Sequence, residues 1–475
     1  MRNLKRALSL ALASVMLLGM MVVGASASYP DVTSENNEEA IEVMQLLGVM
    51  EGDDKGNFNP GKAVTRNEMA VIMTKLLDLN TKDYAGSSPF TDVPAWAEPY
   101  VAACYANKIV SGTSATTFGG DQTVTTAQAA LMILKALGYF QYAADFGEDW
   151  MVSTVKQASK AGLFDGISSN AKTALTRDAV AQMALNALEA DVVDTDGNGG
   201  TTIKGDGFEI STGSAKYEAV KVDEKKAGYD GEKDGVQQLV EKLFGTDVKY
   251  EKKNDDLGHP GYQWTYKTDK VGPFADEADY YVVMTKKYTT NDFSGTDAND
   301  KIAEELGDLV DNDDLKIDNK TELYLNGAEK KTSEVVAALT DKSDNAKFDA
   351  RGLVVEIFCD DDENSDLATR IVLTQYKIAQ IDKVSTKLTK KEAEDNSYKI
   401  TLDGVSKAIL DSDFAGFDAK TYTEDAYVLY ALNKDGDKVL DSQIADTVEG
   451  KVDATKDGKV RINGDYYTDV TTKVE

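Results

Sequence analysis

The stretch AVTRNEMAVIMTKLL, residues 63–77, has the pattern of an amphipathic helix with a capped start. Thr65 can act as the N-cap, and Glu68, three residues later, can complete a capping box. The apolar residues that follow recur at helical spacing on one face; they are Met69, Ile72, Met73, Leu76 and Leu77. Arg66 is unexpected, because a cation in the first turn opposes the helix dipole. The arginine therefore calls for an explanation other than helix stability.

This stretch recurs twice further along the chain. VTTAQAALMILKAL, residues 124–137, and LTRDAVAQMALNAL, residues 175–188, repeat the capping threonine and the apolar face. The arginine reappears in the third copy as Arg177, whereas the second copy has Thr126 at this position. The third copy has Ala179 in place of the capping-box glutamate. The helix pattern is thus present in all three copies, and the full set of polar residues only in the first.

The segments before these helices repeat as well. A loop glycine precedes each helix; the three are Gly52, Gly112 and Gly166. Trp96 and Trp150 stand sixteen residues before the second and third of them. YPDV and FTDV open the first two copies and contain Asp31 and Asp92, whereas no such opening precedes the third. The pattern therefore predicts that each copy consists of a lead-in segment, a helix, a glycine-containing loop and a capped second helix.

The predicted copies cover residues 29–79, 90–140 and 148–190. A single copy cannot bury both of its apolar faces, so the three should pack around a shared core. The pattern resembles the S-layer homology (SLH) module, with its Phe/Tyr-x-Asp-Val opening, tryptophan, glycine-bounded loop and Thr-Arg-Ala-Glu signature. The resemblance covers about a third of the chain. It implies an all-α-type pseudo-threefold bundle, with one helix per copy at the centre and ligand grooves between copies.

The resemblance also implies a ligand, a secondary cell-wall polysaccharide on peptidoglycan that often carries a pyruvate ketal. A guanidinium can clamp a carboxylate bidentately, and the free N–H groups of a helix start add to it. Tryptophan offers a flat face to a sugar ring, although both tryptophans could instead be core residues, and the two aspartates could be turn residues. The expected polymer-binding residues are Asp31, Arg66, Glu68, Asp92, Trp96, Trp150 and Arg177. We expect fewer than three working grooves.

The N-terminus has the pattern of a secretory signal peptide. Basic residues are followed by an apolar run over residues 8–23 and by the small residues Ala25-Ser26-Ala27. We expect cleavage after residue 27; the alternative is an uncleaved membrane anchor. No later segment is apolar enough to cross a membrane, so the sequence predicts a secreted protein at the cell wall or in an extracellular surface layer.

Charge excludes one class of partner. The chain has 82 acidic and 52 basic residues, a net charge of −30, so it lacks the basic face that nucleic acids need. Asp194, Asp196 and Asn198 imitate the first half of a calcium loop, but Gly205 replaces the glutamate at the twelfth position. Residues 191–204 therefore read better as a polar linker, and no other cofactor is expected. Cys104 and Cys359 are expected as free buried thiols rather than a bridge.

The remainder of the chain has an α+β, strand-rich pattern. We assign 205–350 to an α+β region and 351–475 to β-rich modules. Helices are expected at 235–244, 300–310 and 333–339, and strands at 279–288, 322–327, 352–359, 370–384, 397–404 and 426–432. An internal echo pairs Ile378 with Ile444 and Gly404 with Gly464, which suggests small repeated β modules. A two-residue hairpin turn is expected within 456–459.

Catalytic motifs are absent from the sequence. The single histidine, His259, lies in the turn-like stretch LGHPGYQW, so histidine metal clusters are excluded and no nucleophile elbow supports a triad. The leading interpretation is a non-catalytic surface protein that carries an acidic β-rich exodomain and self-associates in a surface layer. The alternatives are a wall- or polysaccharide-active enzyme with a C-terminal catalytic region and a calcium-organised adhesin.

Overall fold

The chain forms two compact units. The computed structural model describes residues 29–33, 36–195, 202–205, 208–211, 216–222, 235–284, 287–289, 320–331, 340–341, 347–349, 352–359, 367–445, 450–456 and 459–468. One unit comprises residues 27–251 and 263–272, and the other comprises 252–262 and 273–475. We call them the helical unit and the β unit. The predicted signal peptide lies outside the described residues.

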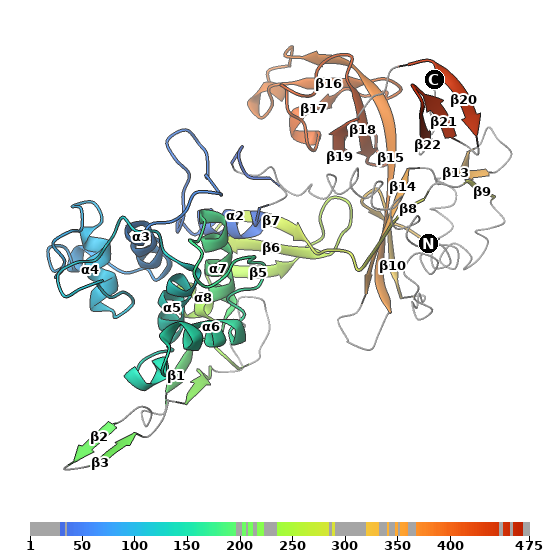
Figure 1. The fold of residues 1–475 in the computed structure, drawn as a ribbon. Coiled ribbons are helices and arrows are strands. Elements are labelled where there is room, and N and C mark those ends of the chain that lie inside the picture. The colour runs from blue at the N-terminus through green and yellow to red at the C-terminus, as the bar shows by residue number, and fades with distance from the viewer. Residues whose placement is uncertain are drawn as a thin grey trace. The chain divides into compact units, whose positions relative to one another are not determined.

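The helical unit contains the repeated helices (Figure 1). They are α2 (Glu38–Leu46), α3 (Arg66–Leu76), α4 (Glu98–Ala106), α5 (Thr126–Leu137), α6 (Trp150–Lys160) and α7 (Arg177–Glu189), with short 3-10 turns at η2 (Thr81–Asp83) and η3 (Ala143–Phe146). Thr65 and Thr125 form the expected capping boxes. Thr176 caps α7 by accepting a hydrogen bond from the backbone of Ala179. The three predicted helix starts are therefore confirmed.

The copies interlock instead of folding one by one. The first helix of each copy packs against the second helix of another: α4 against α3, α6 against α5, and α2 against α7. The residues before the three capping threonines form a closed ring of backbone hydrogen bonds. Val64 N donates to Leu175 O, Leu175 N to Val124 O and Val124 N to Val64 O, at 2.9–3.0 Å. Each copy thus depends on the other two for its hydrogen bonds.

The apolar faces predicted from the repeats form the core of this unit. Met73, Ile133 and Ala184 take equivalent positions in the three second helices, and each is at most 1% exposed. Phe58 and Phe118 in the loops are fully buried. Burial of a large apolar side chain contributes about 1.5–3 kcal/mol, so Met73, Ile133 and the two phenylalanines each stabilise the unit.

The helical unit continues past the third copy. β1 (Val193–Thr195) pairs antiparallel with β4 (Tyr217–Ala219), and α8 (Leu239–Phe244) packs against α7. The helix expected at 235–244 therefore begins four residues late. Residues 235–237 are extended because they hydrogen bond to the backbone at Val192, Val220 and Val222. The domain boundaries assigned from the sequence stay predictions.

Short strands complete the unit. β2 (Thr202–Gly205) pairs with β3 (Phe208–Ser211). β5 (Val248–Lys252), β6 (Gly261–Tyr266) and β7 (Asp269–Ala275) form a three-stranded sheet.

The β unit is built around one long strand, β15 (Ala368–Ser385) (Figure 1). Its first half pairs antiparallel with β14 (Leu353–Cys359) and parallel with β10 (Glu322–Leu325). Its second half pairs antiparallel with β16 (Lys399–Leu402) and β18 (Tyr427–Leu432). The same sheet includes β8 (Tyr280–Met284), β11 (Ala328–Glu329), β17 (Ile409–Leu410) and β19 (Val439–Ile444). A core that includes Ile381, Ile400 and Val428 lies beneath the second half.

Smaller sheets accompany it. β9 (Lys287–Thr289), β12 (Thr340–Asp341) and β13 (Lys347–Asp349) form one, and β20 (Val452–Lys456), β21 (Lys459–Ile462) and β22 (Asp465–Thr468) form another. Lys456 pairs with Lys459, which agrees with the expected two-residue turn. The strand-rich character of this region is confirmed, whereas the strand expected at 279–288 is split into β8 and β9. The helices expected at 300–310 and 333–339 lie outside the described residues, and the repeated β modules stay a prediction.

Both cysteines are free thiols. Cys104 is buried between α4 and α3, where burial raises the pKa of its thiol to about 12. Cys359 is only partly buried, contrary to the expectation, because it is the last residue of β14. Within the described part of the chain, no helix is long and apolar enough to cross a membrane.

Candidate functional site

Arg66, the first residue of α3, lies against the loop of the second copy. Its Nε donates to the carbonyl oxygen of Phe118 at 3.2 Å, and its Nη2 donates to that of Ser111 at 2.7 Å. The guanidinium carbon lies 4.6 Å from the centre of the Phe118 ring, a cation–π distance. Burial lowers the pKa of Arg66 and the charge of Asp92 opposes this effect, so the side chain stays protonated at neutral pH.

Arg177, the first residue of α7, makes the same contacts with the loop of the first copy. Its Nε donates to Phe58 O at 2.7 Å and its Nη2 to Glu51 O at 2.8 Å. Its guanidinium carbon lies 4.5 Å from the centre of the Phe58 ring. We call these two arrangements the Arg66 site and the Arg177 site. Each arginine therefore joins its own copy to the loop of another.

Among the described residues, neither arginine is hydrogen bonded to a carboxylate. The two acceptors of each arginine are carbonyl oxygens, which carry no formal charge. No hydrogen bond joins Nη1 of either arginine to any residue that the structure describes. The edge formed by Nε and Nη2 is occupied by the loop, so a carboxylate clamp must use Nη1 together with the remaining N–H of Nη2. The geometry thus narrows the predicted clamp to one edge of the guanidinium.

Asp31 and Asp92 hold the same loops in place. The two carboxylate oxygens of Asp31 accept the backbone N–H groups of Phe58 and Asn59, each at 2.7 Å. Asp92 accepts those of Phe118 and Gly119 at 2.7 and 2.8 Å, which lowers the pKa of its carboxyl. Each aspartate therefore stabilises the loop whose carbonyl oxygens bind an arginine. This agrees with the alternative interpretation of the two aspartates as turn residues. Their role as polymer ligands stays a prediction.

The loop glycines of the first two copies are required by packing. A Cβ on Gly52 would lie 2.4 Å from Cε1 of Tyr29, and one on Gly112 would lie 2.4 Å from Cε1 of Phe90. In the third copy Gly166 has φ +71°, a conformation that favours glycine, and a Cβ there would meet nothing closer than 3.3 Å. The first two glycines therefore leave room for an aromatic ring of the opening segment to pack against the loop.

The second copy has no cation at its helix start. Thr126 Oγ1 lies 2.8 Å from Ser169 Oγ and donates to Thr173 O at 3.3 Å. Ser169 stands seven residues before Thr176, as Phe118 stands before Thr125, so the arginine–phenylalanine pair is replaced by two hydroxyls. Thr126 is 2% exposed. The helix start of the second copy therefore has no charged side chain against the neighbouring loop, and the hydroxyl groups of Thr126 and Ser169 occupy this place.

The two tryptophans are surface residues. Trp96 is 57% exposed and Trp150 is 40% exposed, so the alternative that they are core residues is wrong. Trp150 is the first residue of α6, where Asp149 provides the N-cap. Exposed indole rings of this kind present a flat apolar face to solvent.

Glu68 is engaged within its own helix start. Its Oε2 accepts the backbone N–H of Thr65 at 2.8 Å, and its Oε1 pairs with Lys62 Nζ at 2.8 Å. Burial by itself raises the pKa of Glu68, but the hydrogen bonds from Lys62 and Thr65 outweigh it and lower the pKa below its usual value. The geometry gives this residue a capping role, and its contact with a polymer stays a prediction.

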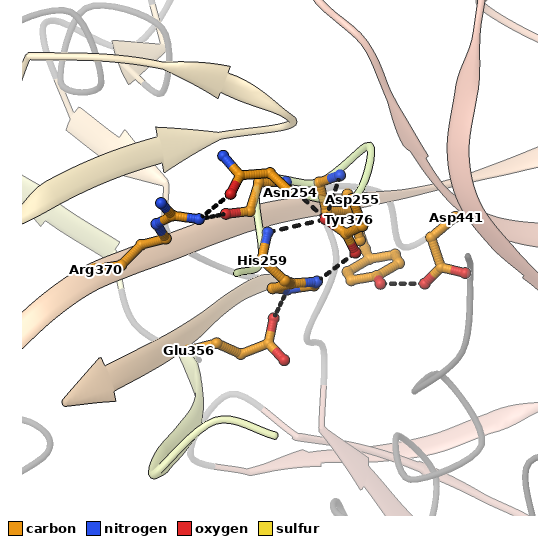
Figure 2. A network of polar contacts seen from close by, with 9 residues as sticks. Asn254, Asp255, His259, Glu356, Arg370, Tyr376 and Asp441 are labelled. Atoms are coloured by element: carbon orange, nitrogen blue, oxygen red, sulfur yellow. Dashed lines mark hydrogen bonds and ion pairs between the residues drawn. The ribbon is translucent and has the colours of Figure 1, made fainter. Parts of the chain in front are cut away.

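Sequence reasoning missed a buried polar network in the β unit (Figure 2). His259 Nδ1 lies 2.7 Å from Asp255 Oδ2, and its Nε2 lies 2.7 Å from Glu356 Oε2 on β14. Burial alone lowers the pKa of His259, but the two carboxylates outweigh it and raise the pKa to about 10. The only signal for this network was the presence of a single histidine in the chain. With both ring nitrogens bound, the imidazolium joins a turn to a strand.

Neighbouring side chains extend this network. Arg370 on β15 donates from Nη1 to Asn254 Oδ1 at 2.6 Å and to Gly258 O at 3.0 Å, and so holds the same turn (Figure 2). Tyr376 donates its hydroxyl to Asp441, and burial raises the pKa of that carboxyl to about 6. Arg370 also pairs with Glu322 on β10. The network thus fastens residues 254–259 to the sheet of the β unit.

A metal site is not assembled by the residues that the structure describes. Among them, no group of three or more His, Cys, Asp or Glu side chains could hold a metal ion. Asp194 lies in β1 opposite Glu218, whereas Asp196 and Asn198 fall outside the described residues. The predicted calcium loop therefore stays a prediction.

Comparison with known proteins identifies the class of the N-terminal region. Residues 28–70 and 89–130 match the S-layer homology domain. This match covers most of the first two copies, including Asp31, Arg66, Asp92 and Trp96. Together with the relatives below, it places the chain among secreted surface proteins associated with the cell wall.

The relatives include surface-layer proteins and enzymes. A surface-layer 125 kDa protein of Lysinibacillus sphaericus is 27% identical over 417 residues, which are 83% of this chain and 33% of that protein. The S-layer protein sap of Bacillus anthracis is 30% identical over 112 residues, 23% of this chain and 14% of that protein. An endoglucanase of Bacillus sp. (strain KSM-635) is 30% identical over 129 residues, 25% of this chain and 14% of the enzyme. The chain spans about a third or less of the length of these relatives.

Proposed function

We propose that the chain anchors a surface protein to the bacterial cell wall by binding an anionic secondary cell-wall polysaccharide, without catalysis. The observation that carries this proposal is the repetition of one arrangement at Arg66 and Arg177. In both, a guanidinium stacks on a buried phenylalanine, and its Nε and Nη2 donate hydrogen bonds to the loop. The positive charge and Nη1 can then interact with a ligand. The same contacts occur at two equivalent places, which favours a shared role for the two arginines. A carboxylate, such as that of a pyruvate ketal, fits this edge of the guanidinium.

The proposal includes a third SLH copy at residues 148–190 and a pseudo-threefold arrangement. Two observations support it. Thr176 caps α7 as Thr65 and Thr125 cap their helices. The three preceding residues close a ring of backbone hydrogen bonds in which each donates to one neighbour and accepts from the other. Residues 29–190 then have three equivalent seams, one per pair of copies.

Two of these seams are suited to an anion. The third has Thr126 and Ser169 where the others have arginine and phenylalanine, so it offers no charge. Trp96 and Trp150 are exposed and can stack on sugar rings of the same polymer. We therefore assign anion binding to the Arg66 and Arg177 sites alone.

The β unit serves as the exodomain in this proposal, and self-association in a surface layer is its expected role. His259, the single histidine, has both ring nitrogens bound by carboxylates, which leaves neither free to act as a general base. The enzyme-named relative above matches only a quarter of this chain. These observations favour a structural role over a C-terminal catalytic region.

The test is sedimentation of the full chain with purified cell walls. Walls that keep their secondary polymer are compared with walls from which the polymer has been extracted. We expect binding only to the first, and a loss of at least tenfold in the double variant R66A/R177A, because each lost charge-assisted contact costs about 1.5–3 kcal/mol. Thr126→Ala is the matched control at the neutral seam and should bind as the parent protein does. Equal binding to extracted walls would contradict the proposal.

A further inference from the structure

The two arginine sites differ in the acids that surround them. At the Arg177 site, the carboxylate of Asp31 accepts the backbone N–H groups of Phe58 and Asn59. Asp53 Oδ2 accepts the side-chain Nδ2 of the same Asn59 at 3.0 Å. Two carboxylates therefore hydrogen bond to Asn59, the residue that follows Phe58. The carbonyl oxygen of Phe58 in turn accepts the hydrogen bond from Nε of Arg177.

At the Arg66 site only one of these carboxylates is present. Asp92 takes the place of Asp31, but Thr113 stands where the first copy has Asp53, directly after the loop glycine. Thr113 Oγ1 donates to Thr117 O at 3.1 Å, and Gly119 replaces Asn59. The segment 111–117 of this loop contains serine, threonine, glycine and alanine but no acid.

The backbones of the two loops agree, so the difference lies in the side chains. Asp53 N donates to Asn57 O at 2.8 Å, and Thr113 N donates to Thr117 O at 2.8 Å. Asn59 and Gly119 both have positive φ, 59° and 71°. A threonine in the first loop or an aspartate in the second is therefore compatible with the same turn.

Acids beside a guanidinium weaken its attraction for a further anion. Hydrogen bonds from the backbone of Asn57 and from Asn59 lower the pKa of Asp53 to about 2, so it is charged at neutral pH. Among the carboxylates that act on the charge of Arg177, Glu68 has the largest effect, followed by Asp31 and Asp53. Asp92 acts on the charge of Arg66, and the second copy has the neutral Gln128 in place of Glu68. Because Asp53 is exposed to solvent, its effect is largest at low ionic strength.

We propose that the anionic group of the polymer binds at the Arg66 site in preference to the Arg177 site, and that the acids around Arg177, among them Asp53, set this preference. The inference rests on the proposed function and goes further, because it ranks two sites that have the same arginine contacts. Both sites can bind a carboxylate, and the Arg66 site binds it more tightly.

The test exchanges the residues at positions 53 and 113 in the full chain. Thr113→Asp gives the Arg66 loop the acid of the other loop, and Asp53→Thr removes it there while keeping a side chain that can bond to the carbonyl of residue 57. Ala85→Asp, at an exposed position outside both loops, adds the same charge as a control. Binding to polymer-bearing walls is measured at low and high salt, and thermal melts check that each variant is folded.

We expect Thr113→Asp to weaken binding about three- to tenfold at low salt and less at high salt, with Ala85→Asp unchanged. Arg66→Ala should weaken binding more than Arg177→Ala, and adding Asp53→Thr to Arg66→Ala should recover about threefold. Equal losses from the two arginine variants, or no effect of either exchange, would overturn the preference and leave the anchoring function intact. Should neither arginine variant alter binding, the proposed function fails and the preference fails with it.

Discussion

The indole Nε1 of Trp264 donates a hydrogen bond of 2.6 Å to Oε1 of Glu39, although 225 positions separate the two residues. Trp264 lies in β6 and is fully buried, and its ring centre is 4.7 Å from that of Tyr250. Glu39 lies in the first turn of α2, the helix that opens the first copy. The helical unit therefore relies on a segment that begins more than seventy residues after the third copy ends.

This relationship predicts that Trp264→Phe destabilises the helical unit. The change removes a hydrogen bond to a carboxylate, worth about 1.5–3 kcal/mol, and leaves a cavity where the indole was packed. We expect the midpoint of thermal unfolding of this unit to fall by several degrees. Trp96→Phe is the matched control, because Trp96 is mostly exposed and its truncation should cost less than about 0.5 kcal/mol. Equal midpoints for the two variants would contradict the assignment.

The His259 network predicts a pH dependence of the β unit. The pKa of His259 is raised to about 10 in the folded chain against about 6.5 in an unfolded one. A raised pKa stabilises the fold when the group is protonated, so the contribution is fully present below pH 6.5 and is lost as the pH rises through 10. The pKa of Asp441, raised to about 6, acts in the same direction between about pH 4 and 6.

The variant His259→Gln isolates the histidine contribution. Glutamine cannot bring a charge between Asp255 and Glu356, so we expect a loss on the order of a few kcal/mol at pH 6. The difference from the parent protein should shrink as the pH approaches 10, because the parent loses the same interaction. Denaturant unfolding at pH 6, 8 and 9.5 measures this. A difference that stays constant across these values would show that the imidazolium charge is not what holds the turn.

Local patterns could be predicted from the sequence because they depend on neighbouring residues. Capping at Thr65 and Thr125 needs only a glutamate or glutamine three residues on, and the buried helix faces follow from the helical period. The same helix pattern placed Arg66 in the first turn of its helix. The hydrogen-bond acceptors of Arg66, Ser111 O and Phe118 O, could not be predicted, because they lie 45 and 52 residues away and no sequence period connects them to the arginine.

Non-local contacts explain the remaining differences. Trp264 and His259 lie in the same stretch, yet one packs into the helical unit and the other binds the β unit. A composition typical of a turn gives no indication of such a division. The sequence also left open whether Trp96 and Trp150 are core or surface residues. Their exposure in the structure shows that they lie at the surface, which the spacing in the sequence could not decide.

Calcium binding near Asp194 is a further prediction. Asp194 lies opposite Glu218 across a strand pair, and like charges in that position are destabilising. If Asp196 and Asn198 complete a loop of extracellular affinity, calcium at about 1 mM should stabilise the chain by about 0.4–1.4 kcal/mol. Thermal melts in calcium, magnesium and chelator measure this, with Asp194→Asn as the variant that should lose the gain. Identical melts in calcium and chelator would dismiss the site.

The loop glycines give the sharpest prediction about the anion sites. In Gly112→Ala the new Cβ would lie 2.4 Å from both Phe90 Cε1 and the carbonyl oxygen of Ser114, and 2.7 Å from that of Thr117. Because two of these atoms are backbone, the loop must shift, and Ser111 O and Phe118 O then no longer hold Arg66. We expect a loss of about 2–4 kcal/mol in stability and a fall in wall binding like that of Arg66→Ala.

Gly61→Ala is the matched control for this change. A Cβ on Gly61 would meet no atom within 4 Å, and this glycine does not have a positive φ, so alanine should fit without strain. It should leave wall binding unchanged and raise or preserve the melting temperature. Sedimentation and melts of both variants decide the matter: if Gly112→Ala stays as stable as Gly61→Ala and binds walls normally, the packing of Phe90 on the loop does not position Arg66.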